Sequence, residues 1–184
     1  FDLKGNGGLS GRHWIDDSGF LHGPILITNT HSVGVVREAA SKWMVQNGYY
    51  YPSFKEGREV PGLGFFYPVV GETYDGALNN INGFWVREEH AMEALDHARG
   101  GSVAEGNVGG GTGMRCHGFK GGTGTASRVL TPEEGGYTVG VLVQANHGTR
   151  ETFQIAGIPF GREIIGCEQD LKALGPKDGE GSII

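Results

Sequence analysis

The segment Gly179-Glu180-Gly181-Ser182-Ile183-Ile184 could carry chemistry, because it places a serine hydroxyl between a glycine-rich stretch and the opening of an apolar strand. Attack of this hydroxyl on the Gly181 carbonyl, followed by hydrolysis of the ester formed in the N-to-O acyl shift, would free the α-amine of Ser182. An α-amine has a pKa of about 7.7–8.0, so it could act as the base for the same hydroxyl at neutral pH. Glycine at position 181 permits the strained backbone that the shift needs. Taken alone, however, a Gly-Ser pair more often marks a loop that enters a strand.

Other patterns in the sequence argue against three further kinds of site. The glycine-rich stretch 106–124 has no Gly-Lys-Ser/Thr ending and no following helix, which disfavours nucleotide binding. The seven histidines include no HExxH motif, and Cys116 and Cys167 have no CxxC or Cys-His metal spacing, so no metal ligands are predicted. No serine lies in a GxSxG elbow, although a Ser-His-Asp triad stays open because its members can be distant in sequence.

The composition indicates a globular domain that binds neither nucleic acid nor membrane. A chain of 184 residues is long enough for one domain with a real core. The net charge is −6 and the 15 Lys and Arg residues are scattered, which disfavours nucleic acid, and no apolar run of about 18 residues could span a membrane. The 35 glycines follow no G-X-Y period, so they indicate several tight, functional loops. The two cysteines are interpreted as reduced thiols.

The first half of the chain predicts two strand-to-helix units separated by an irregular segment. The β-branched run 24–30 predicts a buried strand, and a helix follows from Ser32 to a stop at Asn47-Gly48. Residues 49–67 show neither period and predict a long loop. A second strand is expected from Tyr67 to Gly71. A second helix should then carry its apolar face through Val86, Ala91, Ala94, Leu95 and Ala98 and close at Gly100-Gly101.

The second half predicts a hairpin preceded by a structured loop. The stretch 106–124 is too rich in glycine for a regular element. Thr125–Leu130 and Tyr137–Ala145 are predicted as two strands joined by residues 131–136, and apolar residues alternate in the second strand. A further short strand is expected at 153–155. The polar segment 167–181, rich in residues that break regular structure, leads directly into the apolar residues after Ser182. Because the chain begins without Met and stops at the opening of a strand, it is interpreted as a piece of a longer protein.

Six ordered segments extend over nearly the whole chain and resemble one known family. The segments are PILITNTHSVG at 24–34, PVVGETYDG at 68–76, GNVGGGTGM at 106–114, FKGGTGTASR at 119–128, VLVQAN at 141–146 and the junction at 181–182. Together they are similar to the L-aminopeptidase/D-amidase and β-aminopeptidase family, often called the DmpA-like peptidases. The resemblance turns the Gly-Ser junction into a predicted cleavage site.

The resemblance implies a self-processing hydrolase. Members of the family are made as one chain, cut themselves between Gly and Ser, and keep both pieces in an αβ unit that assembles further. Residues 1–184 are therefore expected to be a single-domain fragment, with 1–181 forming most of the α-chain and 182–184 the start of the β-chain. The expected fold is α+β, an αββα layered sandwich of the DmpA/ornithine-acetyltransferase-like type. The expected enzyme is a serine aminopeptidase that uses no cofactor and releases N-terminal residues from small peptides, amides or esters.

The resemblance also implies roles for individual residues. Ser182 corresponds to the nucleophile, and Asn146, at the end of the second hairpin strand, corresponds to the amide that stabilises the oxyanion. Tyr74 resembles a tyrosine that lines the family's active site, although a packing role is its alternative. The family's further catalytic serine and glutamate lie downstream of the nucleophile and match no position of this chain.

Three more residues are candidates for substrate binding. Glu72 and Asp75 could receive the ammonium group of the substrate, because an aminopeptidase needs a carboxylate there, but solvated surface positions are an equally good interpretation. Gly111 lies in the glycine-rich stretch that would form a wall of the active site, near the nucleophile.

Two other functions remain open at this stage. An acyltransferase of the ornithine acetyltransferase type shares the self-processing fold, but its nucleophile is a threonine where this chain has Ser182. A non-catalytic glycine-rich binding domain with an intact backbone is the alternative from another class. The expected partners are a small peptide, amide or ester substrate, the chain's own β-chain and further αβ units in a homo-oligomer. A cytoplasmic location is favoured over a periplasmic one.

Overall fold

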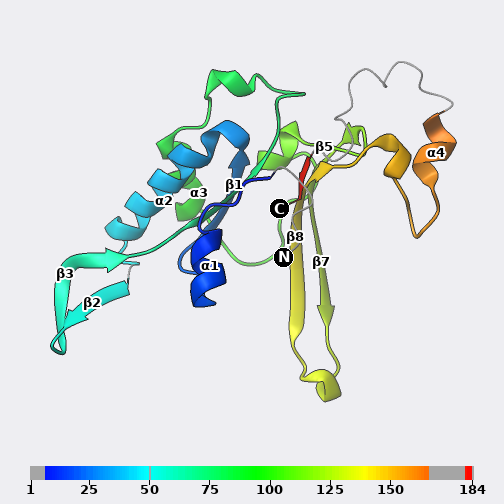
Figure 1. The fold of residues 1–184 in the computed structure, drawn as a ribbon. Helices are drawn as coiled ribbons and strands as arrows, with labels where there is room; N and C mark the ends of the chain where they lie inside the picture. Colours follow the sequence, from blue (N-terminus) through cyan, green and yellow to red (C-terminus); the bar gives the residue numbers. More distant parts are fainter. Residues whose placement is uncertain (1–6, 50, 166–180, 184) are drawn as a thin grey trace. The chain divides into compact units, whose positions relative to one another are not determined.

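A computed structural model describes residues 7–49, 51–165 and 181–183, and its contacts divide the chain into two compact units. The helical unit comprises residues 8–72 and 81–100, and the ribbon unit comprises residues 1–7, 73–80 and 101–184 (Figure 1). Each unit combines helices with strands, in agreement with the predicted α+β class. Within the described ranges, no helix has the length and apolar character needed to cross a membrane.

Among its described residues, the helical unit contains two hydrogen-bonded strand pairs, three α-helices and two short 3-10 helices. Strand β1 (Ile25–Asn29) pairs with β4 (Val69–Thr73), whose last residue belongs to the ribbon unit, and β2 (Tyr51–Lys55) pairs with β3 (Arg58–Phe65). The helices are α1 (Arg12–Ser18), η1 (Thr30–Ser32), α2 (Val33–Gln46), η2 (Ile81–Gly83) and α3 (Glu88–Asp96).

The core of the helical unit lies where α2 and α3 pack side by side (Figure 1). Val36 and Ala39 lie on one face of α2, as their helical spacing predicts, and both are buried together with Val70 and Ala91. Alanine at two of these positions keeps the contacting surfaces small, so the elements can approach closely. The predicted strand-turn-helix over residues 25–47 is confirmed, with β1 leading through η1 into α2. The predicted burial of the strand is wrong, because only Thr28 of β1 is buried.

The loop predicted over residues 49–67 is wrong, because the chain forms the antiparallel hairpin β2–β3 there. Glu56 and Gly57, both with positive φ, form its two-residue turn between the paired Lys55 and Arg58. Positive φ at both positions matches the turn that favours hairpins, although Glu-Gly is a weaker signal than Asn-Gly. The register shifts at Pro52, and proline cannot donate a hydrogen bond to a neighbouring strand. The sequence therefore lacks the regular alternation by which a strand is predicted.

Two other predicted elements are present with shifted ends. Strand β4 begins at Val69, directly after Pro68, instead of at Tyr67, and it extends to Thr73. Helix α3 ends at Asp96, four residues before the glycines expected to close it.

The ribbon unit is built on a three-stranded antiparallel sheet with β8 at its centre. Strand β7 (Gly122–Val129) and strand β8 (Thr138–His147) form the long hairpin in Figure 1, and β9 (Gly181–Ile183) pairs with the end of β8. The predicted hairpin is confirmed, and so is a strand that opens at the Gly-Ser junction. The smaller elements of the unit are η3 (Gly109–Gly113), β5 (Arg115–Cys116), β6 (Phe119–Lys120), η4 (Pro132–Glu134), η5 (Arg150–Thr152) and α4 (Phe160–Ile165).

The short strand predicted at 153–155 is not formed. Only an isolated bridge joins Ile155 to Ile158, because the chain reverses through Ala156 and Gly157, both with positive φ. Most of the predicted polar segment, residues 167–180, lies outside the described residues.

Candidate functional site

The carboxyl end of β8 brings two buried amide side chains to one face of the ribbon sheet. Gln144 and Asn146 are two residues apart, so the period of a strand places them on the same side. Both are almost fully buried, and buried amides must satisfy their donors and acceptors within the protein. Their partners therefore define how this end of the sheet is held.

The Asn146 side chain is fixed by two backbone groups. Its Oδ1 accepts a hydrogen bond from the Tyr74 backbone N–H at 3.0 Å, and its Nδ2 donates to the Arg115 carbonyl at 3.3 Å. Because a backbone N–H can only donate, the oxygen must face Tyr74, which sets the orientation of the amide. The Nδ2 group carries two hydrogens, and the bond to Arg115 uses one of them.

The register between β8 and β9 pairs Asn146 with Ser182 and His147 with Gly181. The backbone of the predicted cleavage junction therefore lies alongside the residue predicted to stabilise its oxyanion. These two residues are 36 positions apart in sequence, and β9 follows a segment outside the described residues. The pairing brings the two predictions together in one strand ladder.

Gln144 is a site residue that the sequence analysis missed. Its Nε2 donates a hydrogen bond to Thr73 Oγ1 at 2.6 Å, and Thr73 is fully buried. Together with the bond from Tyr74 to Asn146, this contact ties residues 73 and 74 to alternate positions of β8. The spacing of Gln144 and Asn146 on a strand was the available signal.

Tyr74 and Asp75 lie next to this anchor. The Tyr74 side chain is about half exposed, and its ring lies so close to Gly76 that a Cβ there would be 2.4 Å from the phenol oxygen. Asp75 is buried, and its Oδ2 accepts a hydrogen bond from Asn79 Nδ2 at 2.8 Å. The role of Tyr74 in lining an active site and the role of Asp75 in binding substrate stay predictions.

Glu72 belongs to the helical unit, unlike the other predicted site residues, and it is buried. Its two carboxylate oxygens accept hydrogen bonds from the Gly8 backbone N–H at 2.8 Å and from Thr30 Oγ1 at 2.5 Å. The carboxylate therefore joins the residues before α1 and the end of β1 to the end of β4. Its predicted contact with a substrate ammonium stays a prediction.

Gly111 lies where the glycine-rich stretch packs against the start of β7. A Cβ at this position would be 2.8 Å from both the Gly106 carbonyl oxygen and the Thr123 backbone nitrogen, in a stretch where Gly106 bridges to Thr123. A Cβ at the neighbouring Gly110 would be closer still to another group, 2.4 Å from Gln144 Oε1. These glycines are required by close approach of backbone to the ribbon sheet, and the role of Gly111 in substrate binding stays a prediction.

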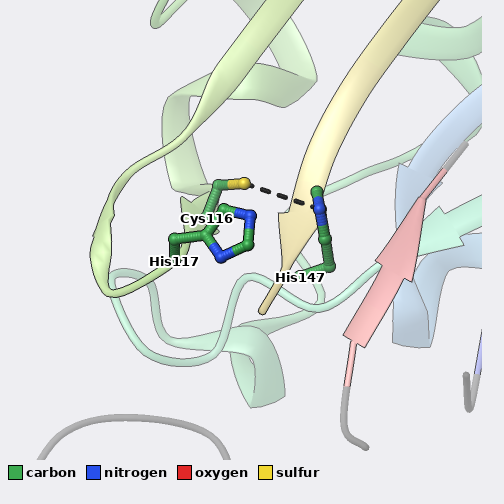
Figure 2. Close-up of side chains that lie close together, drawn as sticks. All are labelled: Cys116, His117 and His147. Carbon is green, nitrogen blue, oxygen red and sulfur yellow. Dashed lines mark hydrogen bonds between the residues drawn. The ribbon is translucent and has the colours of Figure 1, made fainter. Parts of the chain in front are cut away.

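A second group of polar side chains surrounds the last residue of β8. Cys116, His117 and His147 come together although the sequence shows no metal spacing, because β5 and β6 place the first two beside β8 (Figure 2). Burial raises the pKa of the Cys116 thiol, against the opposing effect of its hydrogen bond with His147. Burial and the nearby His117 lower the pKa of His147. At neutral pH, the thiol form of Cys116 and the neutral form of the His147 imidazole are therefore favoured.

The model of peptidase family S58 matches residues 1–184, the full length of the chain. The chain belongs to peptidase family S58. Membership agrees with the resemblance inferred from the six sequence segments. A beta-peptidyl aminopeptidase, BapA, from Sphingosinicella microcystinivorans is 52% identical over 160 residues, which cover 87% of this chain and 37% of the relative.

Solved structures of similar proteins support the same assignment within family S58. A beta-aminopeptidase from a Burkholderia species has a TM-score of 0.76 at 50% identity, over 88% of this chain and 43% of its own. The L-aminopeptidase D-Ala-esterase/amidase from Ochrobactrum anthropi, described as a prototype of the serine aminopeptidases, has a TM-score of 0.75 at 46% identity. The latter match covers 90% of this chain and 44% of that protein. It is a variant of the Ntn hydrolase fold, which confirms the predicted fold class. The chain spans about two-fifths of the length of these relatives.

Substitution of Gly111 by Ala should destabilise this family S58 chain by about 1–3 kcal/mol, because the new methyl group meets backbone on two sides. Gly124→Ala is the matched control, since Gly124 lies in β7 with no atom within 4 Å of the added Cβ and without positive φ. Chemical denaturation of both variants measures the difference. Equal free energies of unfolding for the two would contradict the close packing described for Gly111.

Proposed function

We propose that the full-length protein is a self-processing serine aminopeptidase that cuts its own Gly181–Ser182 bond and uses Ser182 as the nucleophile. The observation that carries this proposal is the pairing of Ser182 with Asn146 in the ladder between β8 and β9, in a chain that belongs to family S58. The names of its relatives, two beta-aminopeptidases and one L-aminopeptidase, support the class of reaction.

Processing begins when the Ser182 hydroxyl attacks the Gly181 carbonyl carbon, and the carbonyl oxygen becomes an oxyanion. The second Nδ2 hydrogen of Asn146 is the donor proposed to stabilise this charge. A donor held in place before the reaction costs no reorganisation when the charge develops, and Asn146 is held by Tyr74 and Arg115. Collapse of the intermediate breaks the C–N bond and leaves an ester, with the proton passing to the new α-amine. Water then hydrolyses the ester, which releases Gly181 as a carboxylate.

Turnover repeats the same chemistry on a substrate. The free α-amine of Ser182 accepts the proton of its own hydroxyl, which attacks the carbonyl after the N-terminal residue of a small peptide, amide or ester. Asn146 again stabilises the oxyanion, and water releases the residue from the acyl-enzyme. We include N-terminal β-residues among the substrates, because two of the similar proteins are named for them.

The remaining features of the proposed enzyme concern its assembly and location. The nucleophile is proposed to begin a β-chain that stays with residues 1–181, and αβ units are proposed to form a homo-oligomer. A cytoplasmic location is proposed because Cys116 is a free thiol, and reducing compartments maintain free thiols.

Replacement of Ser182 by Ala removes the attacking hydroxyl, so the full-length protein should stay a single polypeptide with no measurable aminopeptidase activity. Denaturing electrophoresis and intact-mass measurement give the result, and the wild type should yield two polypeptides, one beginning at Ser182. Ser127→Ala, at an exposed position of β7, is the control and should be processed normally. Normal processing of Ser182→Ala would exclude the mechanism.

The donor role of Asn146 is tested by Asn146→Asp, which keeps an oxygen for the Tyr74 N–H but removes the Nδ2 donor. Loss of one oxyanion donor typically lowers the rate by about 10²–10³, and we expect that loss in both processing and kcat on amino-acid p-nitroanilides. Asn47→Asp, at the exposed end of α2, is the control. An unchanged kcat in a folded, processed Asn146→Asp protein would contradict the proposed role.

Glu72 is proposed to attract the substrate ammonium in addition to its hydrogen bonds with Gly8 and Thr30. Glu72→Gln removes the charge but preserves both bonds, because the amide oxygen can accept from Gly8 and its nitrogen can donate to the threonine hydroxyl. We expect KM to rise about tenfold or more, in keeping with the value of about 1.5–3 kcal/mol for a hydrogen bond to a charged group, while stability changes little. An unchanged KM would contradict the proposed contact with the substrate ammonium and would indicate that Glu72 has only a structural role.

A further inference from the structure

Three side chains with metal-binding atoms gather at the end of β8, and the proposed hydrolysis uses none of them. Cys116 and His117 come from the β5–β6 hairpin, and His147 is the last residue of β8 (Figure 2). One ligand atom from each residue can be chosen so that all three lie within 4.8 Å of one another. The Cys116 thiol points toward the His147 ring, with Sγ 3.5 Å from Nδ1.

These separations are close to those of a tetrahedral metal site. Zn²⁺ binds sulfur at about 2.3 Å and imidazole nitrogen at about 2.0–2.1 Å, so tetrahedral geometry places two such ligand atoms roughly 3.5 Å apart. The Cys116–His147 pair already has that distance. The other pairs would need to contract by about 1.3 Å at most, which rotation of an imidazole ring can provide.

The hydrogen bonding of His117 presents its second nitrogen for coordination. Its Nδ1 lies 3.1 Å from the Thr149 carbonyl oxygen, which can only accept, and 3.2 Å from Thr152 Oγ1. The Thr152 hydroxyl donates its hydrogen to the same carbonyl, so Nδ1 carries the proton. The lone pair is then on Nε2. A metal-bound histidine characteristically donates its other ring N–H to a carbonyl or carboxylate in this way, which fixes the tautomer and the ring orientation.

The backbone places the His117 ring at a conformational cost. His117 and Gly118 form the two-residue turn between β5 and β6, and both have positive φ, which is uncommon for a non-glycine residue. The His117 N–H donates to the His147 carbonyl at 2.7 Å, which fastens the turn to the end of β8. Gly148 leaves room for the ring, since a Cβ there would be 2.3 Å from His117 Nδ1.

Aromatic and charged side chains enclose the same hairpin. Phe153 contacts the His117 ring with a centroid distance of 5.2 Å, and Arg150 donates to the Gly118 carbonyl while its guanidinium lies 3.6 Å from the centre of the Phe119 ring. The Arg150 charge opposes a bound cation, whereas the thiolate formed on coordination favours it. These walls limit the freedom of the ligands before a metal arrives.

We propose that Cys116, His117 and His147 form a binding site for a borderline-soft divalent cation such as Zn²⁺, with a water molecule as the fourth ligand. A thiolate and two imidazoles suit zinc, whereas Mg²⁺ and Ca²⁺ prefer oxygen ligands that this group lacks. Binding forms one metal–sulfur and two metal–nitrogen bonds and releases the thiol proton to solvent. His147 directly follows Asn146 and pairs with Gly181, but the proposed hydrolysis uses the side chain of none of the three ligands, so either proposal can hold without the other.

Cobalt(II) is the probe, because a cobalt–thiolate bond absorbs in the near ultraviolet and a tetrahedral Co²⁺ ion absorbs strongly in the visible. Full-length, reduced, metal-free protein should bind one Co²⁺ per chain with both features, and Zn²⁺ should displace it. Cys116→Ser should remove the near-ultraviolet band and weaken binding at least about 100-fold, since even loss of a ligand's hydrogen-bond partner costs about 10–100-fold. Cys167→Ser, which changes the other cysteine of this sequence, should retain the band.

The two histidines are tested with variants chosen for their backbone. His117→Asn is preferred to Ala because asparagine tolerates positive φ, and His147→Ala completes the pair. Each should weaken Co²⁺ binding at least about tenfold. His97→Ala, at the exposed end of α3, should bind as the wild type does. Circular dichroism checks that every variant is folded. Absence of a thiolate band in the wild type, or a band that persists in folded Cys116→Ser, would overturn the proposal.

Discussion

The hydrogen bonds of the Asn146 carboxamide are the interaction on which the rest of the ribbon unit depends. One amide joins three separate segments: strand β8, the turn after β4 through the Tyr74 N–H, and strand β5 through the Arg115 carbonyl. A buried amide that lost either partner would leave a polar group unsatisfied, at a cost of about 1–3 kcal/mol. The geometry of the amide is therefore set by the same contacts that hold the unit together, and the orientation of its remaining N–H follows from them.

The abundance of glycine has a physical reason near this amide. Backbone approaches backbone at Gly111, and backbone approaches the Gln144 amide at Gly110, at distances that leave no space for a Cβ. A segment packed so closely can satisfy its polar groups against the neighbouring strand, as the bridge between Gly106 and Thr123 illustrates. The glycine-rich stretch is thus ordered against the ribbon sheet, as predicted, without any need for a phosphate ligand. The prediction that it holds no regular element is wrong, because it contains η3, β5, β6 and the start of β7.

Local patterns predicted the parts of the fold that local sequence determines. Alternation identified β8, and helical spacing identified α2. Local patterns did not predict the β2–β3 hairpin, because its strands contain prolines and its turn is Glu-Gly. The hairpin forms through backbone pairing. Within the ribbon unit, Asn146 was found through the family resemblance, while Gln144 was missed because its role depends on Thr73, 71 residues away. The cluster of Cys116 and His147 was missed for the same reason, since only the fold brings them together.

The register of β9 constrains what self-cleavage can change. Before cleavage, three pairs join β8 to β9: Gly181 with His147, Ser182 with Asn146, and Ile183 with Ala145. Cleavage would remove the covalent link at Gly181, so the two later pairs would have to hold the new N-terminus beside Asn146. The entropy gained by a free chain end favours fraying, and only continued pairing and packing after Ser182 can oppose it. If the junction is cut as proposed, Ser182 stays beside Asn146 only when the strand keeps its register on β8. The pairing of Ile183 with Ala145 would then help to position the new N-terminus.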